Sequence, residues 1–193
     1  MHEETSAACP ALRGRPLLER SVGFALAAVQ AVTPEMLPRR TPCASWDLEM
    51  LLLHLRDSLA ALYEGVSLGR IEMRPVSTDR DDDPVSAVRV CAVRLLRASG
   101  GLGRVEIGDR SLEVGMMAAA GAVEVAVHGW DIAQASGERR PFPPGLADEL
   151  LEICPFVVPE SHRRPLFAEP VDAGPGAGAG ERLVAHLGRR PLA

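Results

Sequence analysis

Residues Ala118–Gly129, AAAGAVEVAVHG, decide how this chain must fold. The segment is small and apolar except for Glu124 and His128, so it should be buried. Burying a carboxylate and an imidazole costs free energy unless another group compensates for them. Because four residues make about one helical turn, both side chains would leave the same face of a helix. The segment therefore predicts a buried helix with one polar face, and a divalent metal would be an economical compensating group.

The helix around this segment is predicted to run from about Val114 to Ser136, nearly apolar on all sides. One of its faces places small residues beside the polar ones, which leaves space for a metal and a ligand. That face comprises Met117, Ala120, Gly121, Glu124, His128, Asp131 and Ala135. Met117, Ala120 and Gly121 are accordingly predicted to form part of a pocket wall.

A third candidate ligand, His54, lies in the equally apolar stretch LEMLLLHL. Leucines there form a stripe at helical spacing, and His54 falls about 100° from its centre, where a ligand at the core edge could sit. Two imidazoles and one carboxylate with an open fourth position are the usual composition of a catalytic zinc site, and they also suit iron or nickel. Asp131, about one turn after His128, could hold an imidazole N–H or act as an additional ligand, and it could equally be an exposed or a capping residue.

The same residues also allow an interpretation without a metal. Glu124 and His128 could hydrogen-bond each other, and a backbone carbonyl could satisfy His54, because E-x-x-x-H is a weak pattern by itself. Trp46 and Trp130 are interpreted as core or pocket-wall aromatics. Cys43 could be a nucleophile, but a small half-buried residue is the favoured interpretation. No catalytic nucleophile is therefore assigned.

Composition limits the kind of protein this can be. The chain has 193 residues, 47% of them hydrophobic, which suits one folded domain spanning residues 1–193. All 21 basic residues are arginine, and 26 acidic residues give a net charge of -5, so no general attraction to nucleic acid or anionic membrane is expected. The four cysteines form no CxxC pair, and no signal peptide or membrane span is visible, so a cytoplasmic location is expected.

Apolar periodicity and cap signals predict further helices. These are a helix from Pro16 to Thr33-Pro34, one that follows the N-cap Ser45 and gives way near Gly65 and Gly69, one from Pro84 to Ser99, one over Leu146–Ile153, and a closing helix in ERLVAHLG that Gly188 stops. The stretch VEIGDRSLEV fits either a short strand pair or an irregular loop. Residues 1–13 are expected to be flexible and residues 172–180 to be Gly/Ala/Pro-rich coil. The predicted class is all-α: four main helices in a bundle, with short C-terminal helices and a small extended segment.

Several local patterns resemble one known family. TPCASWDLEMLLLHL (Thr41–Leu55) resembles the T-P-C-x-x-W-D-x-x-x-L-x-x-H-L signature of the DinB/YfiT-like superfamily, and in particular the branch with the metal-binding domain of mycothiol-dependent maleylpyruvate isomerase. EVAVHGWDIAQASG (Glu124–Gly137) resembles that branch's E-x-x-x-H-x-W-D-x-A-x-A-x-G segment. The ending, LFAEPV followed by ERLVAHLGRRP, is similar to the close of single-domain members. The resemblance covers nearly the whole chain.

The resemblance implies a DinB-like four-helix bundle that holds a divalent metal, commonly zinc. Carried over by position, the ligands are His54, Glu124 and His128. Members of the superfamily include S-transferases, in which a metal activates a small thiol such as mycothiol or bacillithiol, as well as isomerases and hydrolases. The chain lacks the separate C-terminal domain that contributes to the isomerase active site, so maleylpyruvate isomerisation is not expected here.

The function expected from these observations is a metal-dependent thiol S-transferase acting on a small electrophilic metabolite. The ion would bind the thiol as thiolate at its open position, which makes a strong nucleophile available at neutral pH. One alternative is a hydrolase, isomerase or cyclase that uses the metal without a thiol. Another is a non-catalytic metal-binding or stress-associated protein. The expected partner is a small-molecule substrate, and pairing into a homodimer through exposed helix faces is a further expectation.

Overall fold

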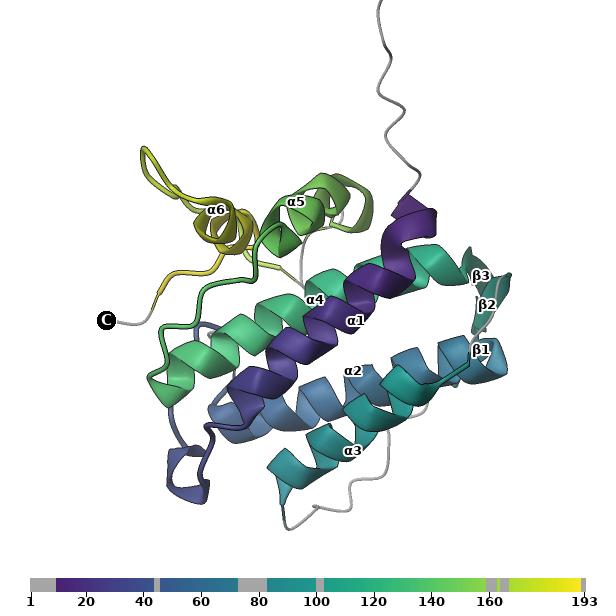
Figure 1. The fold of residues 1–193 in the computed structure, drawn as a ribbon, viewed down its shortest axis with the longest axis horizontal. Helices are drawn as coiled ribbons and strands as arrows, with labels where there is room; N and C mark the ends of the chain where they lie inside the picture. Colours follow the sequence, from purple (N-terminus) through teal and green to yellow (C-terminus); the bar gives the residue numbers. More distant parts are fainter. Residues whose placement is uncertain are drawn as a thin grey trace, which may run out of the picture.

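Four long helices form the body of the molecule in the computed structural model, which describes residues 10–43, 46–72, 83–99, 103–158, 163 and 167–191 (Figure 1). They are α1 (Pro10–Val29), α2 (Leu48–Leu68), α3 (Pro84–Arg97) and α4 (Val114–Ser136). A short 3-10 helix, η1 (Pro34–Met36), lies in the connection from α1 to α2. The predicted all-α bundle is confirmed, and α4 has the bounds that the sequence indicated.

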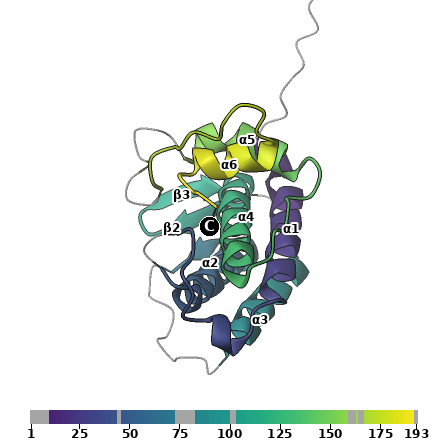
Figure 2. The ribbon, with the colours of Figure 1, turned by 90° about the vertical axis from the view of Figure 1, so that its left-hand side faces the viewer.

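Smaller elements cover one side and one end of the bundle. Helices α5 (Leu146–Val157) and α6 (Ala179–His186) pack beside the bundle, next to α4 (Figure 2). At one end lies a three-stranded sheet of β1 (Arg70–Ile71), β2 (Arg104–Ile107) and β3 (Arg110–Glu113), in the order β1-β2-β3. β1 is parallel to β2, whereas β2 and β3 form an antiparallel pair. VEIGDRSLEV is thus the strand pair, not the irregular loop.

Helix α2 carries one of the candidate ligands, and its ends have clear local causes. The Asp47 side chain is the N-cap and accepts a hydrogen bond of 2.9 Å from the Met50 N–H. Ser45, the predicted N-cap, lies outside the described residues. Gly69 ends the helix with a φ of 66°, a left-handed conformation that suits glycine. The predicted leucine stripe is buried throughout, and it comprises Leu48, Leu52, Leu55, Leu59 and Leu62.

Helix α1 begins earlier than predicted. It starts at Pro10, so residues 10–13 are helical and not flexible, and residues 1–9 lie outside the described residues. Pro16 sits inside the helix and does not open it. Its missing N–H removes one backbone hydrogen bond but leaves the turns on either side helical. An ion pair of 3.1 Å between Arg13 and Glu152 ties the first part of α1 to α5.

The C-terminal helices also depart from their predicted bounds. α5 continues four residues past Ile153, to Val157. α6 begins at Ala179, so the last two residues of the predicted 172–180 coil are helical. The Glu181 side chain accepts a hydrogen bond of 2.8 Å from the Gly178 N–H, which starts the helix. As predicted, the helix stops just before Gly188, whose φ is 76°.

None of the helices in the described part of the chain combines the length and apolarity that crossing a bilayer requires. Cys43, Cys91 and Cys154 form no disulfide with one another.

Glycines allow α1 to approach α4 closely along its length. A Cβ placed on Gly129 would lie 2.8 Å from the Ala25 Cα, and one placed on Gly14 would collide with the Gly115 carbonyl. Because the obstructing atoms belong to helix backbone, they cannot move aside cheaply. A glycine has only a hydrogen atom where other residues have a side chain. Gly14 and Gly129 therefore allow α1 and α4 to lie closer together than larger residues would.

The change Gly129→Ala is predicted to lower the free energy of unfolding of the metal-free protein by about 1–3 kcal/mol, because the added methyl group overpacks the α1–α4 contact. Urea denaturation measures the change. Gly23→Ala in α1 is the matched control, since nothing lies within 4 Å of the position that its methyl group would take. The control should raise the free energy of unfolding by about 0.5–1 kcal/mol through helix propensity alone. Equal effects of the two changes would contradict the close crossing.

Candidate metal centre

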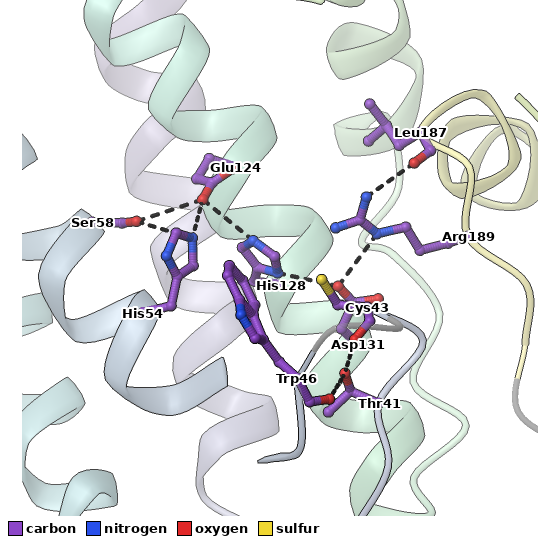
Figure 3. Close-up of polar contacts among 10 residues, drawn as sticks. All are labelled: Thr41, Cys43, Trp46, His54, Ser58, Glu124, His128, Asp131, Leu187 and Arg189. Carbon is purple, nitrogen blue, oxygen red and sulfur yellow. Dashed lines mark hydrogen bonds and ion pairs between the residues drawn. The ribbon is translucent and has the colours of Figure 1, made fainter. Parts of the chain in front are cut away.

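Helices α2 and α4 bring the three candidate ligands to one point (Figure 3). His54 Nε2 lies 2.6 Å from Glu124 Oε1, and His128 Nε2 lies 3.3 Å from the same oxygen. One donor atom from each of the three residues lies within 4.8 Å of the others. Two segments far apart in the sequence thus supply a compact set of two imidazole nitrogens and one carboxylate oxygen.

The spacing of these donors fits a divalent ion. A tetrahedral zinc ion at about 2.0–2.1 Å from each ligand holds its donor atoms about 3.4 Å apart. The donor separations, from 2.6 Å up to at most 4.8 Å, bracket that value. The residues could therefore hold zinc or a similar ion after small side-chain adjustments, and the donor chemistry also suits iron or nickel.

The ionisable groups of the site shift one another's pKa values, and each stabilises the charged form of its neighbour. Burial opposes the ionised form of Glu124, but hydrogen bonds from His128 and His54 outweigh burial and hold its pKa well below the usual range. Burial likewise lowers the pKa of His128, yet hydrogen bonds to Asp131 and Glu124 raise it to about 9. An anionic Glu124 is ready to bind a cation, whereas His128 must lose a proton before it can do so.

Asp131 lies behind His128, away from the cluster of donor atoms. Its Oδ2 is 3.1 Å from His128 Nδ1, and its side chain is fully buried. Because a carboxylate only accepts, Nδ1–H donates to Asp131, so the proton that His128 must lose to bind a cation is the one on Nε2, which faces Glu124. Of the roles considered for Asp131, the geometry favours holding the imidazole N–H, because the carboxylate is buried and contacts His128 Nδ1.

Trp46 forms a wall of the site. Its ring centroid lies 4.3 Å from that of His54 and 5.8 Å from that of His128. The buried Thr41 hydroxyl donates to the Trp46 carbonyl at 2.8 Å, and it also lies 3.0 Å from the Cys43 carbonyl. Ser58, one turn after His54, lies 3.5 Å from Glu124 Oε1. The short segment before α2 is thus held so that an aromatic ring flanks both histidines.

The other residues nominated for the pocket wall differ in their surroundings. Trp130 is buried on another side of α4, where it lines a cavity of about 750 Å³ with Phe142 and residues of α5 and α6. Met117 packs onto Gly65 of α2, and a Cβ on Gly121 would collide with Leu62. Ala120 is half-buried on α4. Gly121 therefore lets the side chain of Leu62 on α2 pack closely against α4.

One charged residue beside this centre could not be foreseen from the sequence. Arg189, which follows α6, is only 5% exposed, and its Nε lies 3.5 Å from Asp131 Oδ2. An arginine in a C-terminal segment rich in arginine and proline carries no signal of burial, because arginine is mostly a surface residue. Only the three-dimensional path of the chain after α6 reveals the contact.

Comparison with known protein families finds one match, which covers most of the helical bundle. A family model described as the mycothiol maleylpyruvate isomerase N-terminal domain matches residues 18–133. The matched region is more than half of the chain; it includes His54, Glu124 and His128 and stops before α5 and α6. No curated protein and no solved structure matches the chain.

The apparent affinity for zinc is predicted to rise as pH rises toward about 9, by about tenfold per pH unit, because the ion must displace the proton that His128 holds. Glu124 should add no slope in this range, since its pKa is already low. Zinc titrations against a competing chelator at several pH values, corrected for the chelator's own protonation, measure the slope. An affinity that stays constant between about pH 6.5 and 8.5 would contradict the proton competition.

Proposed function

This chain belongs to the mycothiol maleylpyruvate isomerase N-terminal domain family, and from that premise we propose that it is a metal-dependent enzyme that transfers a small thiol to an electrophile. The thiol would be of the mycothiol type, and the electrophile a small metabolite. The observation that carries the proposal is the convergence of His54, Glu124 and His128, with Asp131 holding the far nitrogen of one imidazole. Zinc is the ion we propose.

The exposure of the three ligands indicates from which side a thiol would enter. The side chains of His54 and Glu124 are 33% and 28% exposed, whereas that of His128 is 4% exposed. The site is thus closed behind His128 and open beside the other two residues. A bound divalent ion would lower the pKa of a thiol at its open position and so supply a nucleophilic sulfur at neutral pH.

The chain's own residues would orient the reactants. His54, Glu124 and His128 fix the position of the ion, and Asp131 keeps His128 in the tautomer that can ligate. Trp46 presents an aromatic face to both imidazoles, and an apolar electrophile could rest against it. In this proposal the thiol proton passes to solvent, the sulfur forms a bond to the electrophile, and the leaving group departs with the bonding electron pair.

Conjugation of mycothiol to a fluorogenic haloalkane is predicted to require both zinc and Glu124. The change Glu124→Gln should lower the zinc-dependent rate at least about a hundredfold, because a neutral amide replaces the anionic ligand. Glu152→Gln on α5 is the matched control, since that carboxylate is exposed and pairs only with Arg13 among the described residues. The control should leave the rate unchanged.

Two results of this assay would count against the proposal. If the zinc-loaded protein forms no conjugate with mycothiol or bacillithiol and a range of electrophiles, the S-transferase assignment fails. If the protein turns over a substrate at the same rate with and without thiol, the metal serves a hydrolase, isomerase or cyclase instead.

A further inference from the structure

A buried ion pair connects the candidate metal centre to the C-terminal segment of the chain. The Asp131 side chain is fully buried between two partners: His128 Nδ1 at 3.1 Å and Arg189 Nε at 3.5 Å. Figure 3 shows the three groups in a row, with Arg189 on the side away from Glu124. Neither His128 nor Arg189 is more than 5% exposed. The carboxylate thus has a cation on the side away from the imidazole.

The fold after α6 places Arg189 at this point. Gly188 turns the chain with a φ of 76°, and it lies so close to Ala168 that a Cβ on it would be 2.7 Å from the Ala168 Cβ. The Arg189 N–H then donates to the Val184 carbonyl at 2.9 Å, and its Nη1 donates to the Leu187 carbonyl at 3.0 Å. The turn therefore holds the guanidinium beside Asp131 by backbone contacts of α6 itself.

A second buried arginine forms hydrogen bonds to the end of α6 and to the segment before it. Arg163 is 3% exposed and donates through Nη1 to the carbonyls of His186 and Ala168, at 2.9 and 3.3 Å. The guanidinium of Arg189 lies 5.7 Å from the centroid of the Phe167 ring. Burying two guanidinium groups would be costly if they served only to fill space. The contacts of Arg163 and Phe167 thus restrict the position of Arg189 after the end of α6.

We propose that Arg189 is a positioning residue of the metal centre: it balances the charge of Asp131, so that Asp131 can hold His128 in its metal-binding orientation. A buried carboxylate left without its cation would draw in water or rotate away from the imidazole. The pair also retains unused hydrogen-bonding capacity, since Asp131 Oδ1 and Arg189 Nε have no hydrogen-bond partner among the described residues. A small movement of the C-terminal segment toward α4 would convert this close ion pair into a direct hydrogen bond.

Metal binding and docking of the segment around Arg189 should strengthen each other. This coupling rests on the metal-binding part of the proposed function but not on thiol transfer. If docking of the segment strengthens metal binding, metal binding must strengthen the docking by the same free energy. The segment lies beyond residues 18–133, the part of the chain that the family model matches. This chain would therefore complete its metal centre with a residue from outside that common region.

The test is a double-mutant cycle on zinc affinity at one fixed pH, measured by competition with a chelating dye. Arg189→Met keeps much of the side-chain volume but removes the charge, and it should weaken zinc binding about 10–100-fold. Arg189→Lys should restore most of the loss, because it returns a cation. In an Asp131→Asn background, Arg189→Met should have little further effect, since no carboxylate remains to be balanced.

Arg182→Met, on α6 itself, is the matched control. Its side chain is 57% exposed and pairs with Asp148 only at 3.8 Å, so zinc affinity should not change. Thermal unfolding of each metal-free variant confirms that it folds. If Arg189→Met binds zinc as tightly as the wild type, or if its effect is the same with and without the Asp131 carboxylate, the inference is overturned. Absence of zinc binding by the wild type would overturn the metal centre as well, whereas a failed conjugation assay would affect neither.

Amide hydrogen exchange of the wild-type protein provides a test that needs no variant. The Arg189 and Gly188 N–H groups bond to the carbonyls of Val184 and Ala185 at 2.9 and 3.0 Å, so their exchange reports how firmly the segment is docked. Saturating zinc should slow exchange at both amides about as much as Arg189→Met weakens zinc binding. Exchange that is unchanged by zinc would contradict the coupling.

Discussion

The placement of a half-buried carboxylate, Glu124, and a buried imidazole, His128, in an otherwise apolar helix is the constraint on which the rest of this structure depends. Glu124 and His128 leave the same face of α4, and neither could be buried without partners. Glu124 receives contacts from both histidines, and His128 is held between Glu124 and Asp131. A row of polar and charged groups that contact one another therefore runs along this face of α4.

Packing between helices determines the distances between these groups. Gly129 lets α1 lie against α4, and Gly121 lets Leu62 of α2 press against the same helix. The close approach of α2 is what brings His54 within 2.6 Å of Glu124. A larger residue at position 121 would have to displace the Leu62 side chain from the contact between α2 and α4. Gly121 and Gly129 of α4 thus serve the site indirectly, because they allow close packing of the neighbouring helices.

Features that depend on long, regular patterns could be predicted from the sequence. The leucine stripe of α2 and the small-residue composition of α4 carry enough periodicity to place both helices and the three candidate ligands. Helix ends were less predictable. A proline can open a helix or be tolerated within one, so both Pro10 and Pro16 were possible first residues of α1. For the same reason the prediction that residues 10–13 are flexible is wrong.

Contacts that depend on the path of the chain could not be predicted at all. Trp130 is only two residues from His128, but on a helix that places it on another side, against α5 and α6. Arg189 reaches Asp131 because the chain reverses at Gly188, and no local pattern says toward which element such a turn leads. Local periodicity identifies which faces are buried, whereas the partners of those faces follow from tertiary packing.

The central claim is that His54, Glu124 and His128 together bind one divalent ion. Elemental mass spectrometry of the untagged protein, measured beside His54→Ala and His128→Ala, tests this claim most directly. We predict close to one equivalent of metal in the wild type and loss of the metal in both folded variants. A folded wild-type protein that contains no metal and takes up none when zinc, iron or nickel is supplied would contradict the claim.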